Sequence, residues 1–261
     1  MTEKSKILIG PAGTGGASLE NFEYLKQQDV DAVEIEFTYS IWMDKKQAEK
    51  IAELNKKLKL KLSIHAPYYI NLNSEDKKKI EASKKRILKC CEIGNSLGAK
   101  YIVFHPGFYQ KDSKEKTFEN IKKQILVMQK EISKNKWQVE LAPETTGKAS
   151  QFGSLDELVK MKKETGCGIC IDFSHLKARE NGKISYEEMA GKISKAHLGH
   201  IHCHFSGIEF TEKGERRHLL TPEKEIKELF SALKKHSIDC TIINESPDPL
   251  GDVIKMKKLL K

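Results

Sequence analysis

Two short apolar stretches flank one long charged segment: Leu60-Lys-Leu-Ser-Ile-His65 and Lys100-Tyr-Ile-Val-Phe-His105. Each stretch is a nearly continuous apolar run, which is typical of a parallel strand buried on both faces. The segment between them, Asp76–Leu97, carries apolar residues at helical spacing, and Gly98 then suits a left-handed helix C-cap. The sequence therefore predicts a strand, a helix and a second strand here.

The same unit repeats along the chain. Eight short apolar runs alternate with longer amphipathic segments, namely Lys6–Gly10, Ala32–Phe37, Leu60–His65, Lys100–His105, Gln138–Glu144, Cys167–Asp172, His200–His204 and Cys240–Glu245. Strict alternation with eight strands predicts an α/β protein with a closed (β/α)8 TIM barrel rather than an open sheet. We expect one domain over residues 1–261, in which the only long connection is Ser206 to Thr221.

Composition sets limits on compartment and partners. No stretch approaches the roughly 20 apolar residues that cross a membrane, and the polar start Met1–Lys6 lacks the apolar core of a signal peptide. We therefore expect a cytoplasmic monomer with no membrane association, whose six cysteines are reduced and mostly buried. Cys167 and Cys170 are predicted on opposite faces of a strand, too far apart to share a metal. A net charge of +9 is compatible with a nucleic-acid partner and equally with a lysine-rich solvated surface.

Residues that can bind metals occur at the ends of six consecutive predicted strands. They are His65, His105, Glu144, Asp172, His204 and Glu245, and His175 follows closely after Asp172. Chemistry in barrel enzymes gathers at the carboxyl ends of the strands, which all lie at one mouth. The sequence therefore predicts a ring of imidazoles and carboxylates around that mouth.

Such a ring exceeds the need of one metal ion, because a catalytic zinc takes about three protein ligands and a water. Two or three ions that share bridging carboxylates would use the whole set. Mixed histidine and carboxylate ligands without a thiolate fit zinc, manganese or iron. Paired ions of this kind activate water and hold the oxygens of a displacement at phosphorus, so the ring indicates hydrolysis of a phosphodiester bond.

Other titratable residues are assigned supporting roles. His200 and His202 share one face of a strand with His204 but precede its carboxyl end, so we expect them to be hydrogen-bonded within the barrel. Glu34 and Glu36 could support the ligands from behind, although a solvated or lysine-paired role is preferred. His197 and His236 are expected to be solvated.

Several of these strand ends lie within longer motifs, which occur in this order: His65-Ala-Pro-Tyr-Tyr-Ile-Asn-Leu72, Phe104-His-Pro-Gly107, Pro143-Glu-Thr-Thr-Gly147, Asp172-Phe-Ser-His175, His204-Phe-Ser-Gly207 and Asn244-Glu245. At these residues the sequence resembles the endonuclease IV family of AP endonucleases, within the xylose isomerase-like TIM barrel superfamily. The resemblance runs from about the third predicted strand to the end of the chain.

The resemblance implies a zinc-dependent deoxyribonuclease that cuts damaged double-stranded DNA on the 5′ side of an abasic site. By motif position, three zinc ions (Zn²⁺) would be held, with Mn²⁺ as an alternative. His65 and His105 would hold the first ion, and the catalytic Glu144 would bridge it to the second. Asp172, His204 and Glu245 would complete the second site, and His175 would hold the third. Tyr68 matches the position of the tyrosine that the family inserts into DNA.

The sequence departs from the family after the seventh predicted strand. The family supplies Asp-x-His there, whereas this chain has Gly214-Glu-Arg-Arg-His218. His218 can take the place of the histidine, but Arg216 stands where the aspartate is expected and cannot bind a metal. Glu215 is predicted to reach the third ion instead, through one extra residue. The loop Thr38–Met43 also lacks the arginine that the family inserts into DNA.

Two other classes of function remain open. A sugar isomerase or epimerase uses the same barrel with one or two divalent ions, but it needs fewer ligands and has no evident use for His175 and His218. A non-catalytic metal- or DNA-binding barrel is the third interpretation, against which a complete ligand ring at an open mouth argues.

Overall fold

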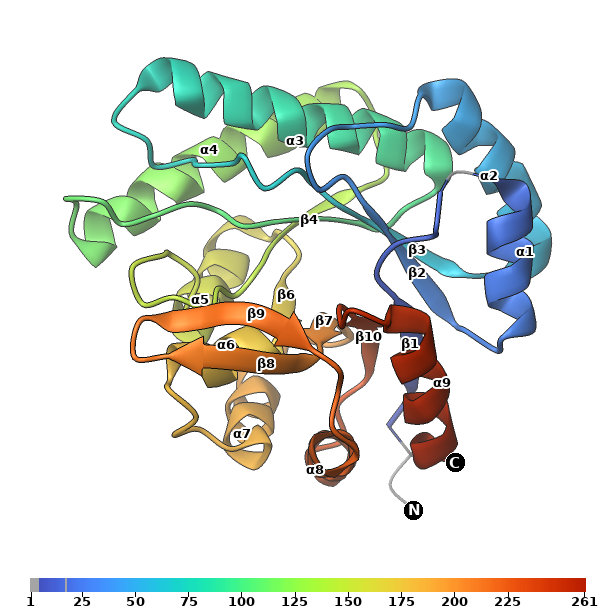
Figure 1. The fold of residues 1–261 in the computed structure, drawn as a ribbon. Helices are drawn as coiled ribbons and strands as arrows, with labels where there is room; N and C mark the ends of the chain where they lie inside the picture. Colours follow the sequence, from blue (N-terminus) through green and yellow to red (C-terminus); the bar gives the residue numbers. More distant parts are fainter. Residues whose placement is uncertain (1–4, 17) are drawn as a thin grey trace.

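The computed structural model describes residues 5–16 and 18–261 and is shown in Figure 1. Its parallel strands form two four-stranded halves, with the orders β1-β10-β7-β6 and β2-β3-β4-β5. The strands are β1 (Ile7–Pro11), β2 (Ala32–Glu36), β3 (Lys61–His65), β4 (Tyr101–Phe104), β5 (Glu140–Pro143), β6 (Cys170–Asp172), β7 (Ile201–Phe205) and β10 (Cys240–Asn244).

Single bridges join the two halves at both seams. Ala12, just after β1, pairs with Glu34 of β2, and Glu144, just after β5, pairs with Cys170 of β6. The backbone N–H of Thr145 also donates to the carbonyl of Cys170 at 3.1 Å. The strands thus follow one another around a ring in chain order, which confirms the predicted (β/α)8 architecture.

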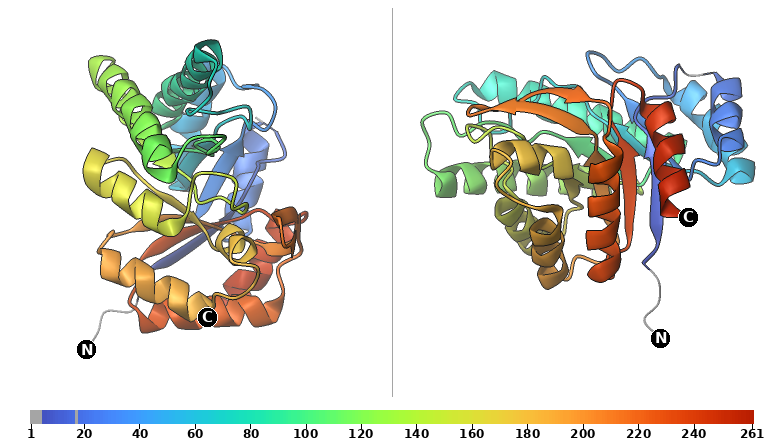
Figure 2. Two further views of the ribbon diagram at one scale, coloured as in Figure 1. Left: turned by 90° about the vertical axis from the view of Figure 1, so that its left-hand side faces the viewer. Right: turned by 60° about the horizontal axis from the view of Figure 1, so that its bottom comes forward.

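Helices cover the outside of the ring, as the two views of Figure 2 show. They are α1 (Leu19–Gln27), α2 (Lys45–Leu58), α3 (Lys77–Leu97), α4 (Lys114–Lys134), α5 (Leu155–Thr165), α6 (Phe173–Arg179), α7 (Tyr186–Ala196), α8 (Glu223–Lys235) and α9 (Pro249–Leu260). Gly98 caps α3 with a φ of 75°, as predicted.

The main apolar core lies between the strands and the helices, and a small separate apolar cluster of Tyr101, Val103, Ala142 and Cys170 lies inside the ring. Buried polar side chains fill much of the remaining interior. All six cysteines are buried and free, as predicted. Cys170 belongs to the inner cluster and Cys167 to the outer core, so the two thiols do face different layers.

The long connection after β7 is an antiparallel hairpin, which the sequence analysis did not predict. It consists of β8 (Gly207–Thr211) and β9 (Gly214–Leu219), and it packs on α6 (Figure 1). Glu209 pairs with Arg217 while Phe210 pairs with Glu215, so a bulge leaves Arg216 as the extra residue of β9.

Across residues 5–16 and 18–261, no helix has both the length and the apolar character of a membrane span. Residues 1–4 of the polar start Met1–Lys6, on which the targeting prediction partly rests, lie outside the described residues.

Candidate metal centre

The carboxyl ends of the strands surround an open cavity of about 520 Å³. Its wall includes six of the predicted ligands, namely His65, His105, His175, Glu215, His218 and Glu245. The other three predicted ligands, Glu144, Asp172 and His204, are buried. The donor atoms of eight of the nine residues form three groups, and within each group all these atoms lie within 4.8 Å of one another. Glu215 joins the third group through its contact with His175. The structure thus brings all nine predicted metal ligands together.

The first group consists of His65, His105 and Glu144. Both Nε2 atoms approach the same carboxylate oxygen, Glu144 Oε2, at 3.1 Å for His65 and 2.9 Å for His105. The Nδ1 of His65 lies 2.8 Å from the carbonyl oxygen of Ala66, which can only accept a hydrogen bond. The proton of the neutral ring is therefore on Nδ1, and Nε2 presents a lone pair to the cavity.

The second group consists of Glu144, Asp172, His204 and Glu245. The other oxygen of Glu144, Oε1, lies 3.2 Å from His204 Nδ1, and Glu245 Oε1 lies 3.3 Å from the same nitrogen. Asp172 Oδ2 is buried and makes no hydrogen bond to the described residues, and His175 Nδ1 lies 3.3 Å from it. An orphaned carboxylate oxygen beside two further carboxylates is a fitting environment for a cation. Glu144 therefore belongs to two groups and offers one oxygen to each.

The third group is built around His175 and His218, whose Nε2 atoms face each other at 3.3 Å, and Asp172 also lies within 4.8 Å of their donor atoms. Each Nδ1 lies 3.0 Å from a backbone carbonyl, that of Thr145 for His175 and that of Glu245 for His218. Because carbonyls only accept, both neutral rings carry their proton on Nδ1 and direct Nε2 lone pairs at one another. Burial lowers the pKa of His175, but Asp172 and neighbouring carboxylates outweigh it and raise this pKa. A cation between the two nitrogens therefore resolves this contact, either a proton or a metal ion, which these residues fit.

The bulge in β9 decides which side chains reach this third group. Residues three apart on a regular strand face opposite sides, but the extra residue Arg216 lets Glu215 and His218 face the same side. Glu215 Oε2 lies 3.4 Å from His175 Nε2, whereas Arg216 turns away and pairs with Glu209 at 2.7 Å. The bulge thus absorbs the extra residue and places Glu215 beside His175, and the role of Glu215 as a metal ligand stays a prediction.

A glycine makes room for the Glu215 side chain. A Cβ atom at Gly147 would lie 2.6 Å from the Cβ of Glu215, well inside van der Waals contact. Gly147 also accepts a hydrogen bond from the backbone N–H of Glu215 at 3.0 Å. The motif that contains Glu144 therefore also positions the hairpin.

The charges of the carboxylates suit cation binding. Burial opposes ionisation of Glu144, but the imidazoles of His105 and His204 outweigh it and hold the pKa of Glu144 well below its usual range. Burial likewise opposes ionisation of Glu245, and His204 nevertheless lowers the pKa of Glu245 to about 2. Both side chains are therefore carboxylates at neutral pH, the form in which they can bind metal ions.

The preferred interpretation of Glu34 and Glu36 as solvated or lysine-paired residues is wrong. Glu34 is fully buried, and its two oxygens lie 2.8 Å from His202 Nε2 and 2.8 Å from His204 Nε2. Glu36 lines the cavity with a buried Oε1 that has no partner among the described residues. Side chains alternate along a strand, so both glutamates face the interior while Val33 and Ile35 face the helices. That alternation was a signal which the sequence analysis missed.

The remaining histidines divide into three kinds. His202 and His200 are hydrogen-bonded within the barrel as predicted, His200 through its Nε2 to Thr241 Oγ1 at 2.9 Å. His197 is exposed at the C-cap of α7, also as predicted. His236 is not simply solvated, because its Nε2 lies 2.8 Å from Glu187 on the neighbouring helix.

Exposed aromatic side chains surround the mouth. Tyr68, whose side chain lies beside the first group, has its ring centre 5.7 Å from that of His65 and 6.1 Å from that of His105. The loops that follow β2, β3 and β4 together expose Tyr39, Trp42, Tyr68, Tyr69 and Phe108. Rings held in this way can stack on flat groups of a substrate.

These observations define a (β/α)8 barrel with a candidate centre for several metal ions at its carboxyl-end mouth. The chain belongs to the xylose isomerase-like TIM barrel family, whose model matches residues 22–261.

Curated relatives support the resemblance to endonuclease IV. The chain is 35% identical to an uncharacterised protein of Methanocaldococcus jannaschii over 99% of this chain and 98% of the relative. It is 26% identical to a probable endonuclease 4 of Carboxydothermus hydrogenoformans over 83% of this chain and 81% of the relative. With a probable endonuclease 4 of Mesomycoplasma hyopneumoniae it is 31% identical, but the match spans only 52% of this chain and 49% of the relative.

Solved structures share the fold. Endonuclease IV from Thermus thermophilus superposes with a TM-score of 0.71 at 20% identity, covering 97% of this chain and 98% of that one. A D-tagatose 3-epimerase-like protein superposes with a TM-score of 0.70 at 18% identity, covering 97% and 95%. At these identities the likeness extends to the fold, which serves both nucleases and epimerases.

Proposed function

We propose that this protein is a zinc-dependent endonuclease that cleaves the DNA backbone on the 5′ side of abasic sites. The observation that carries the proposal is the shared carboxylate of Glu144, which offers Oε2 to His65 and His105 and Oε1 to the group that contains His204. A bridging carboxylate holds two ions close together, and a third group lies directly beside it. Sugar epimerases of this superfamily need one or two ions, so three groups favour phosphodiester hydrolysis.

The nine ligands would divide among three ions, and Asp172, which lies within 4.8 Å of donor atoms in both the second and the third group, is assigned to the second. His65, His105 and Glu144 would hold the first, Glu144 with Asp172, His204 and Glu245 the second, and His175, His218 and Glu215 the third. When bound, such ions supply Lewis acidity and an activated water for displacement at phosphorus. The chain itself keeps the ligands oriented, since the carbonyls of Ala66, Thr145 and Glu245 hold three imidazole rings in the ligand tautomer.

Several features of the mouth support a nucleic-acid substrate. The exposed aromatic rings of the loops after β2, β3 and β4 suit stacking on bases. Lys148 lines the cavity and can neutralise a phosphate. Relatives named probable endonuclease 4 match up to 83% of the chain.

The proposal is tested with a duplex that carries one abasic-site analogue. Zinc-loaded protein is expected to cut the strand once, on the 5′ side of the analogue, and to leave an undamaged duplex of the same sequence intact. A chelator should abolish cutting, and added zinc should restore it. No cutting by protein whose loading with at least two zinc ions has been verified by elemental analysis would contradict the proposal.

Tyr68→Ala is expected to reduce the preference for an abasic duplex over plain duplex, because an inserted ring gains contact only where a base is missing. Base–aromatic stacking is worth about 1–3 kcal/mol, so the preference should fall by roughly five- to a hundredfold. Binding competition between the two duplexes measures it. Tyr69→Ala is the matched control, since Tyr69 is similarly exposed but does not line the cavity. Equal losses in both variants would contradict a specific role for Tyr68.

The third group makes a separate prediction. If His175, Glu215 and His218 hold one ion, each single alanine variant should lose one bound zinc and a similar part of the cleavage rate, and the triple variant should lose little more. Elemental analysis and single-turnover cleavage measure the two effects. Arg216→Ala is the control, because Arg216 points away from the cavity. A Glu215→Ala variant with full metal content would show that Glu215 is not a ligand.

One observation keeps a sugar epimerase as the second candidate. Glu36 lines the cavity, and its carboxylate lies within 4.8 Å of ligand atoms of Glu34 and Glu245. Burial raises the pKa of Glu36 to about 8, which suits a group that exchanges protons near neutral pH. Incubation of the zinc-loaded protein with ketohexoses in deuterated water tests this candidate, since epimerisation exchanges the carbon-bound hydrogen for deuterium.

A further inference from the structure

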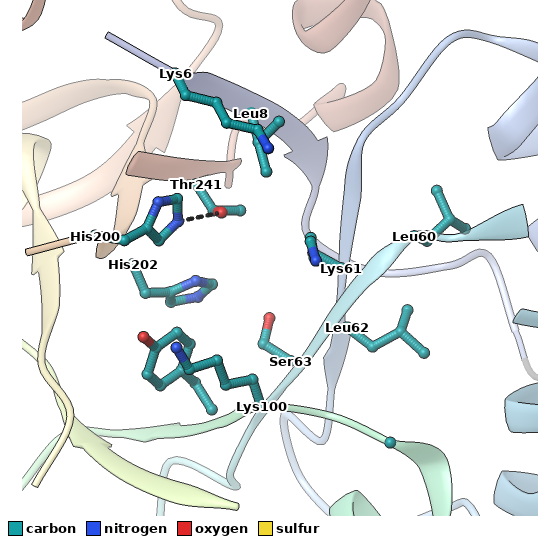
Figure 3. Close-up of a pocket in the computed structure, with 12 residues that line it drawn as sticks. Lys6, Leu8, Leu60, Lys61, Leu62, Ser63, Lys100, His200, His202 and Thr241 are labelled. Carbon is teal, nitrogen blue, oxygen red and sulfur yellow. Dashed lines mark hydrogen bonds between the residues drawn. The ribbon is translucent and has the colours of Figure 1, made fainter. Parts of the chain in front are cut away.

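A second cavity, of about 430 Å³, lies at the opposite, amino-terminal end of the barrel. Figure 3 shows the side chains that surround it. Lys6 and Lys100 directly precede β1 and β4, Lys61 begins β3, and His200 directly precedes β7. Residues far apart in sequence thus place three ammonium groups around one opening because the starts of parallel strands meet at one end of the ring.

The charge around this opening is mostly uncompensated. Within residues 5–16 and 18–261, no carboxylate comes within the 4.0 Å of an ion pair to the ammonium of Lys6 or Lys61, and that of Lys100 lies 4.0 Å from Glu140. The nearby Asp239 accepts a hydrogen bond from the backbone N–H of Lys6 at 2.6 Å. The field at the opening is therefore positive.

The imidazole of His200 reports this field. Burial lowers the pKa of His200, and the charge of Lys100 lowers it further, against the opposing effect of Asp239. The contribution of Lys100 shows that its charge acts at the wall of the cavity. The three lysines act as flexible point charges, which is how lysine commonly binds phosphate.

The wall of the cavity adds hydrogen-bonding groups. Ser63 is almost fully buried, and Figure 3 shows its hydroxyl directed into the opening opposite His202. His200 and Thr241 lie on the same wall. Leu8 provides an apolar part, which a purely inorganic ion would not need. Pockets of about 300–1,000 Å³ typically hold small organic ligands.

We propose that this amino-end cavity binds a phosphate dianion, either free or as the phosphate group of a small phosphomonoester. The lysines would neutralise the two negative charges, the hydroxyl and imidazole groups would donate to the oxygens, and Leu8 would contact a short carbon skeleton. The buried pair of Glu34 and His202 lies between this cavity and the metal ligand His204. The site is thus separate from the candidate metal centre and does not depend on the proposed nuclease function.

The test follows the histidine ring signals by NMR in zinc-loaded protein labelled on histidine, with ionic strength held constant. Inorganic phosphate and glycerol 3-phosphate are the two phosphate probes, and glycerol and chloride are the blanks. Both phosphate probes should shift the His200 signal saturably at millimolar concentrations, and the blanks should not. Tighter binding of glycerol 3-phosphate would identify a phosphomonoester as the ligand, whereas equal binding would identify free phosphate.

The double variant Lys61→Gln/Lys100→Gln should weaken this binding at least about tenfold, because two charges that face the dianion are lost. Lys46→Gln/Lys50→Gln on the exposed face of α2 is the matched control and should bind as the native protein does. If the double variant fails to fold, Lys6→Gln replaces it. Four results would each overturn the proposal. They are the absence of a saturable His200 shift, an unchanged affinity in the variant, a response confined to His105 at the metal centre, and a His200 response to duplex DNA alone.

Discussion

Glu144→Gln is expected to lower the rate of abasic-site cleavage by at least about 100-fold, equivalent to roughly 2.7 kcal/mol or more of transition-state stabilisation. Glutamine keeps the shape of the side chain but removes the negative charge. In the structure that charge lies between His65 and His105 on one side and His204 on the other. Its loss would weaken the hold on two ions at once, so the effect should exceed that of any ligand that serves one ion.

Single-turnover cleavage and elemental analysis together measure this effect. Glu140→Gln is the matched control, because Glu140 begins the same strand, β5, at its exposed amino end. That control should cleave at the native rate and retain all its zinc. Near-normal turnover of Glu144→Gln would mean that another residue bridges the ions, and a loss of rate in both variants would point to damage to the strand rather than to the centre.

Glu34→Ala is expected to have the largest effect on stability among the residues behind the centre. Glu34 is fully buried between His202 and His204, so its removal leaves two buried imidazoles without their partner. Loss of one partner from a buried charged pair costs about 3–5 kcal/mol. Denaturant unfolding of the chelated protein measures this cost without any contribution from metal ions.

The same carboxylate should also affect metal affinity. Glu34 Oε1 lies 2.8 Å from His204 Nε2, though without the angles of a hydrogen bond, while Nδ1 faces Glu144 and Glu245. Loss of such a partner typically weakens metal binding about 10–100-fold. Competition with a coloured chelator measures this effect. Glu34→Gln, which can still accept one hydrogen bond, should be milder in both assays, and Glu23→Gln on the exposed face of α1 should be silent. Full stability of Glu34→Ala would contradict the structural role of the pair.

The barrel and the ligand ring could be predicted from the sequence because both depend on local pattern. A strand buried on both faces is a short apolar run, and its carboxyl end is the point at which the run stops. His65, His105, Glu144, Asp172, His204 and Glu245 all stand at such points, and the mouth of a parallel barrel necessarily brings them together. That part of the site required no knowledge of how distant segments pack.

Other features depended on contacts between distant segments. The hairpin after β7 and its bulge at Arg216 arise from pairing within a segment that has no apolar run to mark it. The inward direction of Glu34 could be inferred from alternation, but its role could not. His202 lies 168 residues away along the chain, His204 lies further still, and both meet Glu34 only across the ring.

The sequence by itself determined the barrel and the six candidate ligands at strand ends, since apolar period and strand ends are local properties, and the family resemblance added His175, Glu215 and His218. Only the tertiary structure decided that Glu215 rather than Arg216 faces His175, because a bulge changes which side chains share a face. It also decided that Lys6, Lys61 and Lys100 face one opening. Nothing in the sequence distinguishes these three lysines from the other basic residues, of which the chain has 46 in all, and closure of the ring is what brings them to one opening.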